Sequence, residues 1–409
     1  MTPSTDELLR SWLSDRDAEI LEFARDLIRT PSVNPPGDET AVANVVVDRL
    51  RTLGINDVRI EAEVPERPNV IARIPGRGGG PRLILSGHLD TKPAGDTAAW
   101  ATGPWDAVLD GARLVGLGSG DMKAAVAGMV YAAGAIRAAG ACSGDLLLVF
   151  TSDEEAGSSF GSRWLAATGR LQADAAIIGE PSGITKEWEA IHLVSRGAAL
   201  FRVRVHGTQM HSSVSDRFPA VNATVQMARL IDRMDRELKG RLSYGGHPLG
   251  GLGPTVNVGV MASAGIFYGI YPGEAEFACD IRTLPGMTRQ TLEADLQSFL
   301  DDVMNDEPDL SAELLMEVWV EPTEISPDEP VVNALADAAS SVLGFRPRLD
   351  AFPGATDAPH FQLVAGIPTV AAFGPGILPR AHSPDEWLDR SGPALSAAIY
   401  ALAAARFLE

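Results

Sequence analysis

The sequence predicts an α/β fold into which a second, α+β domain is inserted. Short apolar runs alternate with longer segments of helical periodicity in both terminal parts of the chain. This alternation favours a sheet covered by helices on both faces. Between these parts, amphipathic strands and two helices indicate a small sheet with one exposed face. The length of 409 residues also suits two domains.

The domain boundaries are placed where the pattern changes. We expect residues 1–188 and 319–409 to form the two parts of the main domain, and residues 189–318 to form the inserted domain. Within the inserted domain, the alternation of apolar and polar residues distinguishes strands from helices. It predicts strands at 197–207, 255–261, 274–283 and Leu314–Val320, and helices at 220–238 and 288–304.

The main domain begins with two segments of helical periodicity. Residues 6–30 carry apolar side chains at helical spacing until Pro31, and residues 39–53 repeat the pattern. Ala124–Ala139 is rich in Ala and Gly and indicates a buried helix, and a further helix is expected at 329–343. Four short apolar runs indicate buried strands: Leu83–Leu85, Leu146–Phe150, Ala175–Ile178 and Thr369–Phe373.

Composition excludes several classes of protein. The 34 Lys and Arg and 54 Asp and Glu residues give a formal net charge of −20. Such an acidic chain does not suit nucleic acid or an anionic membrane surface as a partner. Only two cysteines are present, which fits a reducing cytoplasm. The N-terminus lacks the apolar segment of a signal peptide, and the run Ala124–Ile136 is too short to cross a bilayer.

Polar side chains suited to metal binding follow the predicted strands. In open α/β sheets, sites form outside the carboxyl ends of the strands, so residues far apart in sequence converge there. Each motif taken singly has a structural explanation as a turn or a solvated surface group, but their shared placement favours one joint site. The candidates are His88, Asp90, Asp121, Glu154, Glu155, Glu180 and His382.

This set of side chains suits a pair of divalent cations. Two imidazoles with several carboxylates favour Zn²⁺, which Co²⁺ or Mn²⁺ could replace. The carboxylates would repel one another without compensating cations, and a metal pair needs a bridging carboxylate. Asp121 lies in the middle of the set and is the natural bridge.

Two short spacings carry further roles. In His88-Leu89-Asp90, an extended chain places the outer residues on one face, so Asp90 can orient the His88 ring through its second nitrogen. The adjacent Glu154 and Glu155 must point in different directions. One of them can therefore bind metal while the other acts as a general base.

The sequence resembles the M20 metallopeptidase and amidohydrolase family. That family includes acetylornithine deacetylase, succinyl-diaminopimelate desuccinylase, aminoacylase-1 and the glutamate carboxypeptidases. The resemblance implies an aminopeptidase-like di-zinc catalytic domain with an inserted lid domain that commonly mediates dimerisation. The segments that carry it are LSGHLDTKP, GLGSGDMKAAVAG, FTSDEEAGS, IIGEPSG, VHGTQMHSSV, FACDIRTLPG and AHSPDEWL.

The resemblance also implies a role for each motif residue. Glu154 would be the general acid/base, Asp90 would orient His88, and a cis peptide would follow Asp121. The metal ligands would be His88 and Glu180 for one zinc, Glu155 and His382 for the other, and Asp121 as the bridge.

Four residues are candidates for contacts with substrate. By resemblance, His211 would stabilise the oxyanion, and Arg282 would hold a substrate carboxylate, for which its guanidinium is well suited. Gly354 and Thr356 belong to a glycine-rich turn near the substrate in that family. One departure is Gly269, which stands where family members often carry an Asn that contacts substrate.

These observations lead to three hypotheses about function. The first is hydrolysis of the amide bond of an N-acyl-amino acid by a zinc-activated water. The second is a dipeptidase or carboxypeptidase that acts on small peptides with a free C-terminal carboxylate. The third is a non-catalytic binding protein, which the complete set of ligands and the retained Glu154 argue against. A cytoplasmic homodimer formed through the lid domain is expected.

Overall fold

The computed structural model describes residues 4–140, 142–249 and 252–409. The chain divides into two compact units, which are described separately below. The main unit comprises residues up to Val194 together with Glu324–Phe352 and Thr356–Glu409. The inserted unit comprises Ser195–Thr323 and Pro353–Ala355, and it overlaps the predicted insertion at 189–318. In the described part of the chain, no helix has the length and apolar character needed to span a membrane.

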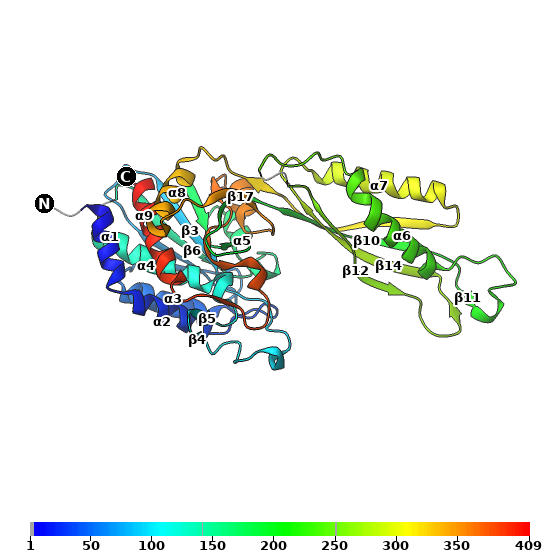
Figure 1. The fold of residues 1–409 in the computed structure, drawn as a ribbon, viewed down its shortest axis with the longest axis horizontal. Helices are drawn as coiled ribbons and strands as arrows, with labels where there is room; N and C mark the ends of the chain where they lie inside the picture. Colours follow the sequence, from blue (N-terminus) through cyan, green and yellow to red (C-terminus); the bar gives the residue numbers. More distant parts are fainter. Residues whose placement is uncertain (1–3, 141, 250–251) are drawn as a thin grey trace. The chain divides into compact units, whose positions relative to one another are not determined.

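A six-stranded sheet forms the centre of the main unit. Its strand order is β1-β2-β6-β3-β7-β18. Figure 1 labels β3 and β6, the two neighbouring strands in the middle of this order. The strands from β6 to β18 run parallel, whereas β2 pairs antiparallel with β6, and β1 pairs antiparallel with β2. The strands are β1 (Val58–Glu61), β2 (Asn69–Ile74), β3 (Arg82–His88), β6 (Asp145–Thr151), β7 (Ala175–Ile178) and β18 (Thr369–Val370).

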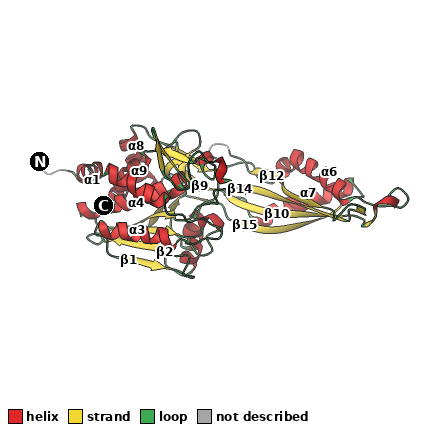
Figure 2. Ribbon diagram, turned by 90° about the horizontal axis from the view of Figure 1, so that it is seen from below, coloured by secondary structure: helices red, strands yellow, loops and turns green. Residues whose placement is uncertain are grey.

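Helices cover both faces of this sheet, as predicted. On one face, α4 and α9 pack against each other and both contact β3 (Figure 2). On the other face, residues of α5 and the segment His360–Val364 join the sheet in an apolar cluster. The helices of the unit are α1 (Thr5–Ser14), α2 (Asp17–Ile28), α3 (Thr40–Thr52), α4 (Ala124–Ala139), α5 (Ser162–Ala167), α8 (Pro330–Leu343) and α9 (Gly392–Phe407).

Small residues allow α4 to lie deep in the main unit. Every residue from Ala124 to Ile136 is buried. At Gly128, an added Cβ would lie 2.0 Å from the Ser396 hydroxyl of α9, so only glycine permits this close approach of the two helices. The composition of α4 thus fixes the position of its N-terminal end, which follows the turn that carries Asp121.

Short strands complete the main unit. A three-stranded sheet has the order β20-β5-β4, and β19 pairs with β8. A third small sheet has the order β16-β9-β17. Their bounds are β4 (Val108–Asp110), β5 (Arg113–Val115), β8 (Pro181–Gly183), β9 (Ala190–Ser195), β16 (Thr323–Glu324), β17 (Arg348–Phe352), β19 (Gly374–Ile377) and β20 (Trp387–Asp389).

In the residues that the structure describes, the inserted unit contains a four-stranded antiparallel sheet and two α-helices. The sheet has the order β12-β14-β10-β15, and β11 pairs with β13 in a separate ribbon. Residues of β10 alternate between buried and half-buried from Phe201 to Val205, as expected for a sheet with one covered face. The elements are β10 (Gly197–His206), β11 (Met210–His211), α6 (Ala223–Glu237), β12 (Thr255–Ala264), β13 (Ile270–Tyr271), β14 (Glu274–Thr283), α7 (Arg289–Asp306) and β15 (Ser311–Val320).

The structure differs from the sequence prediction at both ends of the main unit. The predicted helix 6–30 is two helices, because the chain turns at Asp15 and Arg16 and α2 starts anew at Asp17. The predicted strand Thr369–Phe373 pairs with β7 only at Thr369 and Val370. Helix α9 and strands β1 and β2 were not predicted.

Candidate metal centre

The parallel strands bring the candidate ligands to one edge of the sheet. His88, the last residue of β3, lies opposite Thr151, the last residue of β6, in the strand register. Glu154 and Glu155 follow β6 within four residues, and Glu180 follows β7 by two. The ligand candidates from three strands therefore leave the sheet at the same edge.

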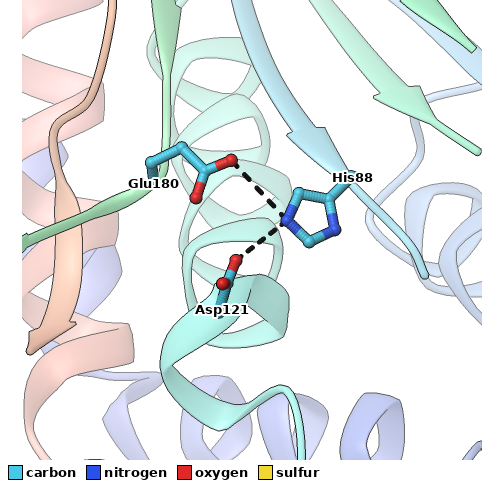
Figure 3. A group of neighbouring side chains, drawn as sticks. All are labelled: His88, Asp121 and Glu180. Atoms are coloured by element: carbon cyan, nitrogen blue, oxygen red, sulfur yellow. Dashed lines mark hydrogen bonds and ion pairs between the residues drawn. The ribbon is translucent and has the colours of Figure 1, made fainter. Parts of the chain in front are cut away.

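A first group of possible ligands consists of His88, Asp121 and Glu180. The Nε2 atom of His88 lies 2.9 Å from Oδ1 of Asp121 and 3.6 Å from Oε1 of Glu180 (Figure 3). All three residues are buried. Figure 3 shows the two carboxylates directed at the same ring nitrogen from different elements, the turn before α4 and the segment after β7.

A second group consists of Asp121, Glu155 and His382. The Nε2 atom of His382 lies 3.1 Å from Oδ2 of Asp121 and 3.1 Å from Oε1 of Glu155. The His382 side chain is exposed, and its backbone adopts a left-handed φ of 60°. This group is therefore open to solvent on the histidine side, as a site that admits a substrate must be.

Asp121 belongs to both groups and presents a different carboxylate oxygen to each. Its Oδ1 faces His88, and its Oδ2 faces His382. A carboxylate that offers one oxygen to each of two neighbouring sites is the arrangement that a pair of metal ions requires. The peptide bond between Asp121 and Met122 is cis, as the family resemblance implies.

The donor set fits divalent cations on chemical grounds. Each group offers one imidazole nitrogen and two carboxylates, which are ligands that Zn²⁺ accepts. Burial and the neighbouring carboxylate of Asp121 raise the pKa of Glu180 well above its usual value. Bound cations would remove this penalty, because they compensate the charge of carboxylates that otherwise repel one another in a buried site.

Nearby carboxylates raise the pKa values of both histidines, and Asp121 acts on each of them. Burial alone would lower the pKa of His382, but hydrogen bonds with Asp121 and Glu155 raise that pKa to about 10. The pKa of His88 is likewise raised well above its usual value, against the effect of burial, by Asp121 and Asp90. In the protein without cations, protons on the imidazoles thus provide the positive charge that the carboxylates need.

Glu154 is in neither group of possible ligands among the described residues. Burial raises the pKa of Glu154 well above its usual value, and the carboxylate of Asp357 adds to this effect. Asp357 is itself held by the hydroxyls of Ser158 and Thr151, which donate to its two oxygens at 2.5 and 3.2 Å. A carboxyl group with a raised pKa beside a metal centre has the properties of a general base or acid.

Asp90 contacts more of the site than the sequence predicted. The Nδ1 atom of His88 lies 3.0 Å from the main-chain oxygen of Asp90 and 3.5 Å from its carboxylate. The carboxylate accepts hydrogen bonds from the main-chain N–H groups of Glu154 and Glu155, at 3.2 and 3.0 Å. Asp90 therefore contacts both the imidazole of one group and the backbone of the Glu-Glu pair.

Sequence reasoning missed two charged residues at the site. The Glu386 carboxylate accepts hydrogen bonds from the N–H groups of Gly118, Gly120 and Asp121, and so holds the turn that carries the shared ligand. The Lys92 ammonium pairs with Glu155 Oε2 at 3.3 Å. Lys92 lies in the motif segment LSGHLDTKP, and Glu386 lies in AHSPDEWL. Their positions within these motifs could have identified them as site residues.

The candidates for substrate contact are divided between the units. His211, Arg282 and Gly354 belong to the inserted unit, whereas Thr356 belongs to the main unit, where it is buried. His211 is exposed, and its Nδ1 accepts a hydrogen bond from the Ser213 N–H at 3.2 Å. Gly269 is exposed and has a left-handed φ of 82°, a conformation that favours glycine, and an added Cβ would contact no other residue.

Arg282 has a second arginine beside it that the sequence did not single out. Arg282 pairs with Asp280, with 3.0 Å between Nε and Oδ1. Burial and the charge of Arg282 lower the pKa of Arg196, a buried residue that donates to Thr255 at 2.7 Å. The Nε atom of Arg196 has no hydrogen-bond partner among the described residues. The Nε–H of Arg196 is thus a donor that a ligand carboxylate could accept from, a pairing for which a guanidinium is suited.

Two curated proteins are similar to most of this chain. Succinyl-diaminopimelate desuccinylase of Gluconacetobacter diazotrophicus is 31% identical over 370 residues, which cover 88% of this chain and 90% of that protein. Acetylornithine deacetylase of Proteus mirabilis is 31% identical over 378 residues, or 90% of this chain and 92% of that protein.

Solved structures share the fold. An M20 family metallo-carboxypeptidase from Sulfolobus solfataricus has a TM-score of 0.74 at 20% identity, covering 94% of this chain and 99% of that one. A dinuclear metal-binding M20 peptidase from Bacillus subtilis has a TM-score of 0.68 at 17% identity, covering 97% and 99%. The model of peptidase family M20/M25/M40 matches residues 84–406. The chain therefore belongs to peptidase family M20/M25/M40.

Proposed function

We propose that this M20 hydrolase cleaves the amide bond of an N-acyl-amino acid at a centre of two divalent cations. One observation carries the proposal: Asp121 is shared by two ligand groups, and Glu154 lies outside both with a raised pKa. The names of the relatives, desuccinylases and deacetylases, support an N-acyl-amino acid as substrate.

The proposed centre assigns each ligand candidate. His88 and Glu180 would hold one cation, Glu155 and His382 the other, and Asp121 would bridge them. We propose Zn²⁺ as the metal, with Co²⁺ or Mn²⁺ as replacements. The two ions would activate a water molecule and polarise the scissile carbonyl.

Glu154 is proposed as the general base and then the general acid. Its carboxylate would accept a proton from the attacking water and return that proton to the nitrogen of the leaving amine. In the metal-free protein, burial and the carboxylate of Asp357 raise the pKa of Glu154, so its surroundings favour uptake of a proton. Asp90 would keep Glu154 in place through the main-chain hydrogen bond and would orient His88 through Nδ1.

The inserted unit would supply two further groups. We assign His211 as a donor to the oxyanion, because its motif matches that of the family and its side chain is exposed. Arg282, with Arg196 beside it, would hold the carboxylate of the amino-acid product. We place Gly354 near the substrate as well, because its carbonyl accepts a hydrogen bond from the main-chain N–H of Arg196 at 3.1 Å. Thr356, two residues further along the chain, is proposed to contact substrate with it.

We also propose that the protein is a cytoplasmic homodimer, and exposed apolar side chains of the inserted unit support the dimer. Strand β12 is at the edge of its sheet and exposes Val260 and Met261, and the following loop exposes Phe267 and Tyr268, the latter to 93%. Such groups on a sheet edge favour association with a second copy of the chain.

A substrate panel tests the proposed activity. Metal-loaded protein is incubated with N-acetyl-amino acids, N-succinyl-amino acids and dipeptides, and the release of free amine is measured. We expect hydrolysis of the acylated amino acids and its loss in Glu154→Gln. Cleavage of dipeptides alone would replace the proposal with the dipeptidase alternative. A protein that holds two metals per chain and hydrolyses none of these compounds would overturn the proposal.

A further inference from the structure

A buried polar network adjoins the Glu154-Glu155 pair, and Asp90 is the one member of it to which the proposed mechanism gives a role. Its centre is Asn34, which is 0% exposed. The Asn34 side-chain nitrogen donates to Asp90 Oδ2 at 2.9 Å and to Asp153 Oδ1 at 3.0 Å. One amide group therefore uses both of its hydrogens to join two buried carboxylates that would otherwise repel each other.

The carboxylates of Asp90 and Asp153 accept hydrogen bonds from the main chain around Glu154. Asp90 accepts from the N–H groups of Glu154 and Glu155. Asp153, with a left-handed φ of 65°, accepts from the Phe160 N–H at 3.2 Å through its other oxygen. The position of the Glu154 side chain thus depends on two carboxylates that a single asparagine fixes relative to each other.

Arg67 holds Asn34 in turn and supplies positive charge. Its guanidinium donates to Asn34 Oδ1 at 3.2 Å and to Glu39 Oε1 at 2.7 Å, and it lies 3.7 Å from Asp153 Oδ1. It also donates to the Pro36 carbonyl at 2.8 Å. Arg67 is only 9% exposed. A buried guanidinium with this many partners is fixed in both position and orientation.

The loop around Asn34 is shaped to the guanidinium of Arg67. At Gly37, which has a φ of 79°, an added Cβ would lie 1.6 Å from the Arg67 Nη1 atom. Glu39 is also fully buried, and its carboxylate accepts a hydrogen bond from the Arg67 guanidinium. The loop that contains Asn34 and Gly37 and the segment that contains Arg67 therefore hold Asp90 and Asp153 together.

We propose that Asn34 and Arg67 are positioning residues for Glu154. They act through Asp90 and Asp153, and in the described part of the chain neither donates to a side chain of the two ligand groups. The proposal rests on the proposed function in taking Glu154 as the proton carrier. It predicts that the network affects the rate of the chemical step more than substrate affinity or metal content.

The test compares Asn34→Ala, Asn34→Asp, Arg67→Met and Arg67→Lys with Arg49→Met. Arg49 is a suitable control because it is also a partly buried arginine of the main unit, but it donates to Tyr131 at 2.8 Å, away from the Glu-Glu pair. For each protein, kcat, KM, metal content and thermal midpoint are measured. Hydrogen exchange of the peptide covering residues 152–160 is followed by mass spectrometry.

We expect kcat to fall about 10- to 100-fold in Asn34→Ala, Asn34→Asp and Arg67→Met, as for other residues that support a metal site. KM should change less than kcat, two metals per chain should remain, and residues 152–160 should exchange faster. Arg67→Lys, which keeps the charge without the planar fork, should recover part of kcat. Arg49→Met should lower the thermal midpoint and leave kcat and the exchange unchanged.

Two results would overturn the proposal. One is a kcat in the folded Asn34 and Arg67 variants that equals that of Arg49→Met. The other is unchanged exchange of residues 152–160, which can be measured whether or not the protein turns over a substrate. An inactive wild-type protein would instead contradict the proposed function, and the exchange data would then decide the positioning role alone. If Asn34→Ala and Arg67→Met fail to fold, Asn34→Asp and Arg67→Lys carry the test.

Discussion

Asp121 Oδ1 lies 2.9 Å from the Nε2 atom of His88. The same carboxylate approaches His382 with its other oxygen at 3.1 Å, so one residue joins two ligand groups from distant parts of the chain. Glu386 fixes the turn that carries this residue through three main-chain hydrogen bonds. The shared carboxylate is therefore held in place before any cation binds.

Replacement of Asp121 tests the bridging role. In Asp121→Ala, both ligand groups lose a donor, so we expect fewer than two metals per chain and loss of amide hydrolysis. Metal content measured by mass spectrometry after dialysis gives the result. Asp174→Ala is the matched control. Asp174 accepts a hydrogen bond from the N–H of Arg82, the first residue of β3, whereas His88 is the last residue of that strand. Retention of two metals by Asp121→Ala would exclude a bridge.

Substitution of Glu154 should affect catalysis, and substitution of the adjacent Glu155 should affect metal binding. We expect Glu154→Gln to lower kcat about 10²- to 10⁴-fold, the usual range for loss of a general base, with both metals still bound. Glu155→Gln should instead lower the metal content, because Glu155 belongs to the second ligand group. Parallel measurement of kcat and metal content in the two variants is the check. The opposite pattern would exchange the two roles.

Lys92 should compete with a cation for Glu155. Its ammonium lies 3.3 Å from Glu155 Oε2 and is 37% exposed, so this pair must separate or rearrange when a cation binds. We expect Lys92→Gln to bind the second cation more tightly, because the cation no longer has to displace an ammonium from the Glu155 carboxylate. Calorimetric titration of the metal-free protein measures this. Weaker binding in Lys92→Gln would show that the lysine supports the site.

The sequence predicted the ligand candidates because their positions follow from sheet geometry. Apolar runs marked the strands, and parallel strands end at the same edge, so His88 and Glu180 could be placed together. The H-x-D spacing predicted contact between Asp90 and His88, but the main-chain oxygen of Asp90 lies closer to the ring than its carboxylate does. The alternation of side chains along an extended chain predicts on which face each one lies, but it does not predict the hydrogen-bond partners of that side chain.

The supporting contacts could not be predicted, because they join segments far apart in the chain. Glu386 binds the Gly118 N–H across 268 positions, and Asn34 joins Asp153 across 119. No periodic pattern marks such pairs. The break between α1 and α2 was missed for a related reason: apolar residues of both helices face the core, so the helical spacing continues across the turn at Arg16.

Glu187 should make the main unit less stable at neutral pH than at acidic pH. Burial raises the pKa of this residue to about 7, and its Oε2 atom has no hydrogen-bond partner among the described residues. The folded protein therefore binds the proton more tightly than the unfolded chain, so stability is lost as the pH rises from about 4.5 to about 7. Glu187→Gln, which stays neutral, should gain about 1–3 kcal/mol over wild type between pH 5 and pH 8. Urea unfolding at the two pH values measures this difference, with the exposed Glu317→Gln as the control. An equal loss of stability in wild type and Glu187→Gln would show that Glu187 does not titrate in this range.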